Sequence, residues 1–264
     1  MTVSPLLTWL DVNSWKLDLD GLTVLIDPWL TGDLVFGNAP WLIRGLRPAP
    51  VSMPEQIDLI VLSQGLADHA HPETLQRLDK SIPVVASASG AAVARDLGFE
   101  CVRALPPGES YVLADQLTVT ALPGAPLGPL VTENAYVMTV LTTGHAIYYE
   151  PHGYPSQQLE ALPDVDVAIT PIVSLKLPLA GAVIRGGEGA IEVAKLTHPQ
   201  VILQTAEGGD VTYTGLLSSL LRQTGGADAL RSQLAAADLQ TQVTPLRPMQ
   251  SLPLDFAPRH PRPA

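Results

Sequence analysis

The chain has 264 residues, enough to bury the core of one large mixed α/β domain. Hydrophobic residues make up 46% and charged residues 16%, a composition that indicates a compact globular protein and excludes a disordered one. The net charge of −11 and the scattered basic residues exclude a nucleic-acid groove, because phosphate binding needs clustered Lys and Arg.

Cysteine use and hydropathy indicate the compartment. Cys101 is the one cysteine, so no disulfide can form within the chain, which fits a reducing environment. No apolar run approaches the ~18 residues that a membrane helix needs, so we expect no membrane insertion. The start of the chain lacks the basic and apolar regions of a signal peptide. We therefore expect a cytoplasmic protein.

The first third of the chain begins with strand patterns. Asp20-Gly21 lies between two alternating runs and predicts a β-hairpin, and Pro28 should end the second strand. A long segment, residues 30–56, follows. Long loops are often lids or binding surfaces, so its aromatic residues could line a wall for a ligand. We favour instead a satellite core built from Trp29, Phe36 and Trp41.

The stretch "VLSQGLADHAHPETL" then places three metal-competent side chains in one loop. An apolar strand over residues 57–63 ends there, and a helical pattern over residues 72–79 begins after it. The loop between them carries Asp68, His69 and His71. Chemistry in α/β proteins is placed outside the carboxyl ends of strands, so this loop is the first candidate site.

The remaining elements complete a second strand-rich block and a second α/β block. Strands are expected at 83–87, 101–105, 110–115, 117–123, 135–150 (with a turn at Thr143-Gly144), 165–172 and 200–205, and helices at 89–98, 187–198, 212–225 and 227–239. His145 on the turn and His198 near a helix end should be solvated. No linker divides residues 1–250, which we expect to form a single domain. Residues 251–264, with His260, should form an extended or loosely docked proline-rich tail.

Four stretches resemble the metallo-β-lactamase fold, and more narrowly the branch similar to L-ascorbate-6-phosphate lactonases. They are "GLTVLIDPWLTG", "DLIVLSQGLADHAHPETL", "AIYYEPHGY" and "GGEGAIEVAKLTHPQVILQT". The resemblance implies an α/β protein built as a four-layer αββα sandwich. It also implies a metal-dependent hydrolase whose ligands come from an H-x-H-x-D-H loop and from later loops.

Compared residue by residue with the family, this sequence lacks most of the metal ligands that the resemblance implies. Asp68 and His69 match the Asp and His of the family loop, whereas Gln64 and Leu66 stand where its first two His are expected. The resemblance places the later ligand positions at Gly124 to Pro126, at Pro151 and near Thr205. Leu has no lone pair and Gln offers only a neutral amide oxygen, so we predict no dinuclear zinc centre.

Nearby residues could supply substitute ligands. His71 follows the loop, Glu150 and His152 flank Pro151, and Glu207 lies just beyond Thr205. Carboxylate and imidazole together suit one divalent ion, Zn, Fe or Mn. On this hypothesis Asp68, His69, His71 and His152 would be metal ligands, and Asp68, Glu150 and Glu207 would be catalytic.

Structural roles explain the same residues without a metal. Asp68 could cap the helix that begins near Pro72, and a backbone carbonyl could hold His69. Structure or solvent is favoured for His71, Glu150, His152 and Glu207. Asp27 is expected to tie the loop together by hydrogen bonds.

Two functions remain open. The first is a metal-dependent hydrolase of an ester, lactone or phosphoester with at most one metal, acting on a small molecule. The second is a non-catalytic descendant of the fold, without a cofactor, that binds a small molecule or a protein.

Overall fold

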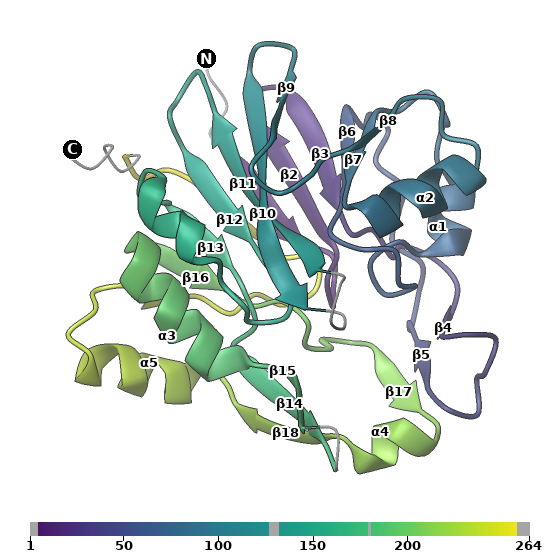
Figure 1. Ribbon diagram of the computed structural model, residues 1–264. Coiled ribbons are helices and arrows are strands. Elements are labelled where there is room, and N and C mark those ends of the chain that lie inside the picture. The colour runs from purple at the N-terminus through teal and green to yellow at the C-terminus, as the bar shows by residue number, and fades with distance from the viewer. Residues whose placement is uncertain (1–4, 127–131, 179–180, 258–264) are drawn as a thin grey trace. The chain divides into compact units, whose positions relative to one another are not determined.

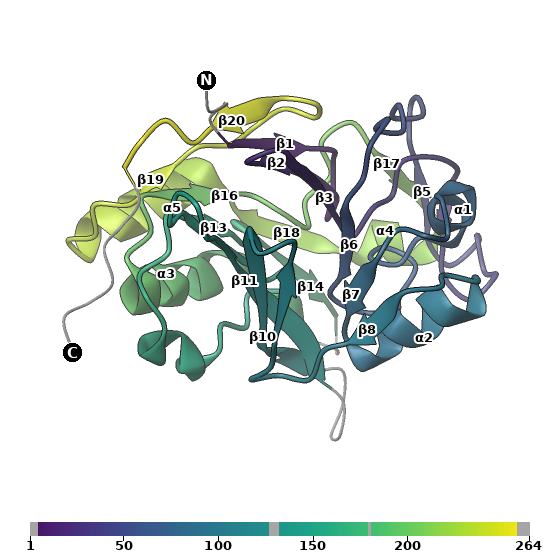
Figure 2. The same cartoon turned by 90° about the horizontal axis from the view of Figure 1, so that it is seen from above.

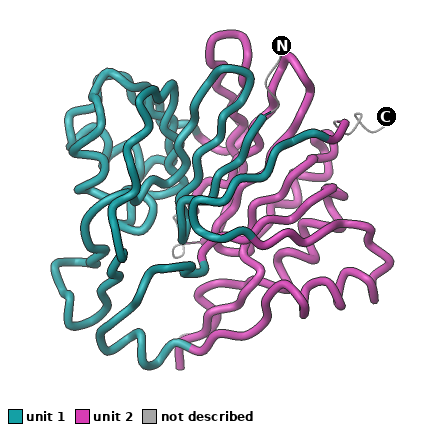
Figure 3. The backbone as a smooth tube through the Cα atoms, turned by 180° about the vertical axis from the view of Figure 1, so that it is seen from behind, with its two compact units in different colours: residues 1–105, 207–221, 246–255 teal, residues 106–206, 222–245, 256–264 magenta. Residues whose placement is uncertain are grey.

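The computed structural model describes residues 5–126, 132–178 and 181–257, so His260 lies outside the described residues. The chain divides into two compact units (Figure 3), and each has its own sheets and helices. Unit 1 comprises Met1–Leu105, Glu207–Leu221 and Leu246–Asp255. Unit 2 comprises Pro106–Ala206, Arg222–Pro245 and Phe256–Ala264.

Unit 1 contains a seven-stranded sheet, a small sheet and three helices (Figure 1). In sheet order the strands are β20 (Ser251–Pro253), β1 (Leu6–Trp9), β2 (Trp15–Leu19), β3 (Leu22–Ile26), β6 (Leu59–Leu62), β7 (Val84–Ala86) and β8 (Val102–Ala104). The small sheet has the order β17 (Thr212–Thr214), β5 (Arg44–Leu46), β4 (Leu34–Val35). The helices are α1 (Pro72–Arg77), α2 (Ala88–Asp96) and α4 (Leu216–Leu220).

The hairpin predicted at Asp20-Gly21 joins β2 to β3. Both turn residues have positive φ, 50° and 87°, as the tight turn that matches strand twist requires. From β3 onward the strands β3, β6, β7 and β8 pair in parallel. The loops after β3 and β6 therefore leave the sheet at the same edge.

Helices α1 and α2 pack on the sheet of unit 1 through an apolar core. Leu75 of α1 and Ala91 and Ala94 of α2 are fully buried and share this core with Ile60 and Leu62 of β6. Because the core fixes both ends of the loop between β6 and α1, that loop is held at a defined place at the carboxyl edge of the sheet.

Unit 2 has the same general plan. Its large sheet has the order β19 (Gln242–Val243), β16 (Val201–Leu203), β13 (Val167–Ile169), β12 (Ala146–Tyr149), β11 (Thr132–Val140), β10 (Leu117–Pro126), β9 (Ser110–Leu113). A small sheet has the order β15 (Gly181–Ile184), β14 (Val173–Leu177), β18 (Arg222–Gly225). The helices are η1 (Gln157–Ala161), α3 (Gly186–Thr197) and α5 (Ala227–Ala236), and α3 and α5 pack together beside β13 and β16 (Figure 2).

The prediction of a single helix over residues 212–225 is wrong. This segment forms β17, the short helix α4 and β18 in turn. Gly215 has φ 105°, outside the helical region, and a Cβ at this position would lie 2.8 Å from the carbonyl oxygen of Leu42. Strand pairing of Tyr213 with Gly45 and of Gly225 with Val173 overrides the local helix propensity.

The proline-dense segment begins as a strand. Residues Ser251–Pro253 form β20, which pairs antiparallel with β1. The expected tail is thus extended at its start, and it contributes the edge strand of a sheet.

None of the helices in residues 5–126, 132–178 and 181–257 is long and apolar enough to cross a membrane.

Candidate functional site

The carboxyl edge of the sheet in unit 1 is organised by Asp27, the residue after β3. Its carboxylate accepts the backbone N–H of Ser63 at 2.7 Å and the Ser63 hydroxyl at 2.5 Å. Asp27 is completely buried and has φ 41°, so the strand turns sharply at this residue. Asp27 therefore ties the ends of β3 and β6 together by hydrogen bonds, as the sequence predicted.

His69 lies between two carboxylates. Its Nδ1 is 2.7 Å from Asp27 Oδ2, and its Nε2 is 3.1 Å from Asp68 Oδ2. The His69 side chain is completely buried, whereas that of Asp68 is 22% exposed. The side-chain nitrogen of Asn13 lies 3.3 Å from the same Nε2. His69 is thus held by carboxylates and not by the backbone carbonyl that we expected.

The pKa of His69 is raised well above its ordinary value. Burial by itself lowers this pKa, but the charges and hydrogen bonds of Asp68 and Asp27 outweigh burial. A protonated imidazole between the two carboxylates is the arrangement that these contacts favour. Asp27, His69 and Asp68 form a closed ionic cluster, which we call the Asp–His–Asp cluster.

The donor set does not fit the dinuclear metal centre that the fold implies. Across the described residues, no group of three or more His, Cys, Asp or Glu is placed to hold a metal ion. Asp68 and His69, the two ligands that the resemblance implies in unit 1, contact each other. A structural or catalytic zinc ion takes three or four protein ligands. At the place of a later family ligand, a side chain on Gly124 would press on the backbone of β11, 3.0 Å from the nitrogen of Ala135.

The resemblance places Gln64 and Leu66 at the first two His of the family loop, and the environments of these two side chains differ. Leu66 is 47% exposed. Gln64 is completely buried, and neither its side-chain oxygen nor its nitrogen has a hydrogen-bond partner among the residues the structure describes. A buried amide without a partner costs free energy, so we expect a water molecule or another polar group beside this side chain.

His71 has a structural role. It is the N-cap residue of α1: its Nδ1 accepts the backbone N–H of Thr74 at 3.3 Å, and its Nε2 lies 3.2 Å from the carbonyl oxygen of Asp33. Both ring nitrogens are therefore used, and neither is available to a metal in this structure. Burial lowers the pKa of His71, which keeps the capping imidazole neutral.

Replacing His71 by Ala should lower the free energy of unfolding by about 1–2 kcal/mol, because it removes the cap of α1 and the contact to Asp33. Chemical denaturation measures this change. The matched control is Ser87→Ala, which removes the equivalent cap of α2, where Ser87 Oγ accepts the N–H of Gly90. A His71 variant as stable as the wild type would contradict the structural role.

Glu207 is half-buried in unit 1, and burial raises its pKa to about 7. A raised pKa means that the folded state holds the proton more tightly than the unfolded chain. Protonated Glu207 therefore makes its whole contribution to the stability of the folded state below pH 4.5. This contribution is lost as the pH rises through about 7. A carboxyl group that titrates near pH 7 is compatible with the predicted acid–base role of Glu207. That role stays a prediction.

Replacing Glu207 by Gln should therefore flatten the dependence of stability on pH. Between pH 5 and pH 8 the wild type should lose about 1 kcal/mol more than the variant, after allowance for solvent screening. Denaturant unfolding at several pH values gives this difference. Parallel curves for the two proteins would contradict the raised pKa.

In unit 2, Glu150 holds a loop. Its buried carboxylate accepts the backbone N–H groups of His152, Gly153 and Tyr154, at 2.9, 2.5 and 2.8 Å. Burial raises the pKa of Glu150, and His152 together with these hydrogen bonds acts in the opposite direction. With its oxygens used by three amides, Glu150 anchors the loop in this structure, and its role as a ligand or base stays a prediction.

His152 contacts a carboxylate that the sequence did not point to. Its Nδ1 lies 2.8 Å from Oε2 of Glu133, a completely buried side chain at the start of β11. We missed Glu133 because it stands in an ordinary strand pattern, "TENAY", with no motif around it. Asn13 was missed because it lies in the turn between β1 and β2, with no motif around it. For Glu133 the available indication was a charged residue at the start of a strand that is mostly apolar further on.

Two of the other sequence predictions need correction. His145 is buried rather than solvated: its Nδ1 lies 3.0 Å from Thr143 Oγ1 and its Nε2 2.9 Å from the carbonyl oxygen of Phe256. Trp41 is 68% exposed and does not join the satellite core, which contains Trp29 and, at its margin, Phe36. His198 is exposed at the end of α3, as expected.

Comparison with known proteins identifies the family and the fold. A family model described as "Beta-lactamase superfamily domain" matches residues 6–206. No curated protein matches the chain.

Several solved structures are similar. One is Igni18, described as a novel metallo hydrolase from the archaeon Ignicoccus hospitalis, with 16% identity, a TM-score of 0.67 and coverage of 96% of this chain and 100% of that one. An isothiocyanate hydrolase from Delia radicum gut bacteria has 18% identity, a TM-score of 0.66 and coverage of 96% and 99%. The diiron β-hydroxylase CmlA from Streptomyces venezuelae has 15% identity, a TM-score of 0.66 and coverage of 96% of this chain but only 55% of its own.

At these identities the likeness establishes the fold, and the family match covers most of the chain. The expected mixed α/β fold class is confirmed, and the chain belongs to the beta-lactamase superfamily, with the metallo-β-lactamase fold.

Proposed function

We propose that this protein is a non-catalytic descendant of the fold that binds a small polar molecule at the carboxyl edge of the sheet in unit 1. The observation that carries the proposal is Gln64, completely buried with both polar side-chain atoms unpaired among the described residues. The Asp–His–Asp cluster supports it, because Asp68 and His69 bind each other instead of presenting open ligand positions.

The chemistry of an amide defines the ligand class. The Gln64 side chain offers one acceptor oxygen and one donor nitrogen. A group that presents an N–H beside a carbonyl, as a lactam, urea or imide does, satisfies both at once.

NMR titration with 2-pyrrolidinone tests this class, and N-methyl-2-pyrrolidinone is the matched probe that lacks the N–H. We expect the lactam to shift the amide resonances of residues 63–69 and the methylated probe to leave them in place. Gln64→Met should abolish the shifts. Equal shifts with the two probes, or none with the lactam at saturating concentration, would contradict the proposal.

The same substitution should stabilise the ligand-free protein. Methionine fills the volume of Gln64 without a polar group, so Gln64→Met should raise the free energy of unfolding by about 1–3 kcal/mol. The matched control is Gln204→Met: Gln204 is also buried but has an interaction partner, so its loss should destabilise. Destabilisation by Gln64→Met would show that water or protein atoms already satisfy the amide.

The second candidate is the metal-dependent hydrolase of an ester, lactone or phosphoester, in the branch similar to L-ascorbate-6-phosphate lactonases. One observation favours it: Asp27 holds Nδ1 of His69, as carboxylates hold metal-binding His, and Nε2 lies beside Asp68. This function requires a further protein ligand and one bound metal ion. Metal content therefore separates the two candidates.

A further inference from the structure

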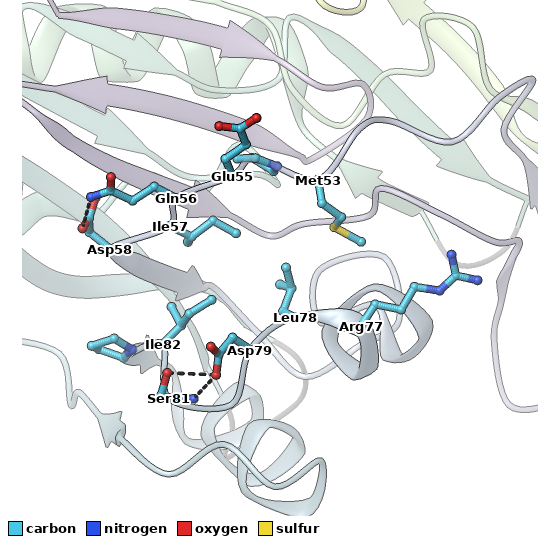
Figure 4. A pocket seen from close by; sticks show the side chains of 12 residues that line it. Met53, Glu55, Gln56, Ile57, Asp58, Arg77, Leu78, Asp79, Ser81 and Ile82 are labelled. Carbon is cyan, nitrogen blue, oxygen red and sulfur yellow. Dashed lines mark hydrogen bonds between the residues drawn. The ribbon is translucent and has the colours of Figure 1, made fainter.

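A pocket lies at the opposite end of unit 1 from the Asp–His–Asp cluster. It is formed by residues 53–58, which lead into β6, and by residues 77–79 and 81–83, from the segment between α1 and β7 (Figure 4). Its volume is about 480 Å³, within the range of small-molecule sites. Asp27 and Ser63 follow the carboxyl ends of β3 and β6, whereas this pocket lies at the amino ends of β6 and β7.

The floor of the pocket is apolar. Met53 and Ile57 come from the first segment and Leu78 and Ile82 from the second, and their side chains lie toward one another in Figure 4. All four pack against the core beneath α1 and α2. An aliphatic chain placed here would bury its methylene groups, each of which contributes about 0.8 kcal/mol when fully removed from water.

The rim of the pocket carries three carboxylates, Glu55, Asp58 and Asp79. Two of them are fixed by hydrogen bonds. Asp58 accepts the N–H of Thr23 at 2.7 Å and Gln56 Nε2 at 3.0 Å, and Asp79 accepts the N–H and hydroxyl of Ser81 at 2.9 and 2.8 Å. The hydrogen bonds from Ser81 lower the pKa of Asp79, so this carboxylate stays charged.

The two basic residues of this region are bound elsewhere. Arg77 pairs with Glu73 at 2.6 Å and points away from the other lining side chains (Figure 4). Lys80 donates to the carbonyl of Leu75, and its Nζ lies 4.4 Å from the ring centroid of Phe99. Lys80 is close enough to Asp79 to interact with its charge, but the three carboxylates outnumber it, so the rim carries net negative charge above an apolar floor.

We propose that this pocket binds a small organic cation, an aliphatic chain that ends in a primary ammonium group. The chain lies on the floor of Met53, Ile57, Leu78 and Ile82, and the ammonium group lies at the carboxylates of the rim. A neutral chain would leave the charged rim unpaired, and an anionic one would be repelled by it. The site is independent of the function proposed at Gln64.

NMR titration with n-hexylamine tests the proposal, with 1-hexanol and hexanoate as probes of the same length. Hexylammonium should shift the resonances of residues 53–58 and 77–83 with a dissociation constant on the order of 1 mM, as expected for a ligand of this size. Hexanol should bind more weakly and hexanoate should not bind. Hexanoate binding as tightly as hexylammonium, or no shift at saturation, would overturn the proposal.

Variants that change one charge show whether hexylammonium binds at the rim of the pocket. Glu55 is exposed, so Glu55→Lys should fold normally and weaken hexylammonium binding about fivefold, corresponding to about 1 kcal/mol for a charge pair near the surface. Glu100→Lys changes the net charge equally on an exposed residue outside the pocket and should leave binding unchanged. Asp79→Asn, which keeps an acceptor for Ser81, should weaken binding as Glu55→Lys does. Equal effects of Glu55→Lys and Glu100→Lys would overturn the proposal.

Discussion

Replacing Asp27 by Ala should lower the free energy of unfolding by about 3–5 kcal/mol, the range for removing one partner of a buried ion pair. The change leaves His69 buried beside Asp68 alone, and it leaves the N–H and hydroxyl of Ser63 without their acceptor. Urea denaturation of the two proteins measures the loss.

Two further variants show whether burial causes this effect. Asp27→Asn keeps the shape and an acceptor oxygen, so it should recover part of the loss. Asp18→Ala removes the partner of Lys16 in an ion pair at the surface, where the expected loss is below about 1 kcal/mol. A similar small loss for Asp27→Ala would contradict the Asp–His–Asp cluster as a structural element.

Replacing Glu150 by Ala should destabilise by about 3 kcal/mol, because three backbone N–H groups at the edge of unit 2 lose their shared acceptor. The loss should be local first: hydrogen exchange of the amides of residues 152–154 should accelerate. Both effects follow from an anchoring role.

Glu150→Gln is the matched variant. It keeps one acceptor oxygen, so it should lose less stability than Glu150→Ala and retain part of the protection of these amides. If Glu150 were a metal ligand or general base, Glu150→Ala would leave stability and amide exchange near the wild-type values. That result would restore the catalytic role considered for this residue.

Local patterns in the sequence predicted the fold well where neighbouring residues decide the conformation. Asp20-Gly21 fixes the hairpin, and the strand, loop and helix around Asp68 follow from the change in apolar spacing. Residues 212–225 were mispredicted because their two strands depend on pairing with Gly45 and Val173, far away in the sequence.

The candidate site was predicted only in part, for the same reason. Asp68 and His69 are adjacent, so their association was visible in the sequence. The contact of His69 with Asp27 spans 42 residues, and that of His145 with the carbonyl of Phe256 spans 111, so neither can be read from spacing. Glu133 could not be identified from the sequence, because only its contact with His152 in the folded structure distinguishes it.

The central claim is that Asp68 and His69 bind each other instead of a metal. Elemental analysis of Zn, Fe and Mn in protein purified without chelators, from cells supplied with all three metals, tests it most directly, with His69→Ala analysed in parallel. We predict substoichiometric metal in both proteins and a clear drop in melting temperature for the variant. One or more metal ions per chain in the wild type, lost in His69→Ala with a near-native melting temperature of the apoprotein, would contradict the claim.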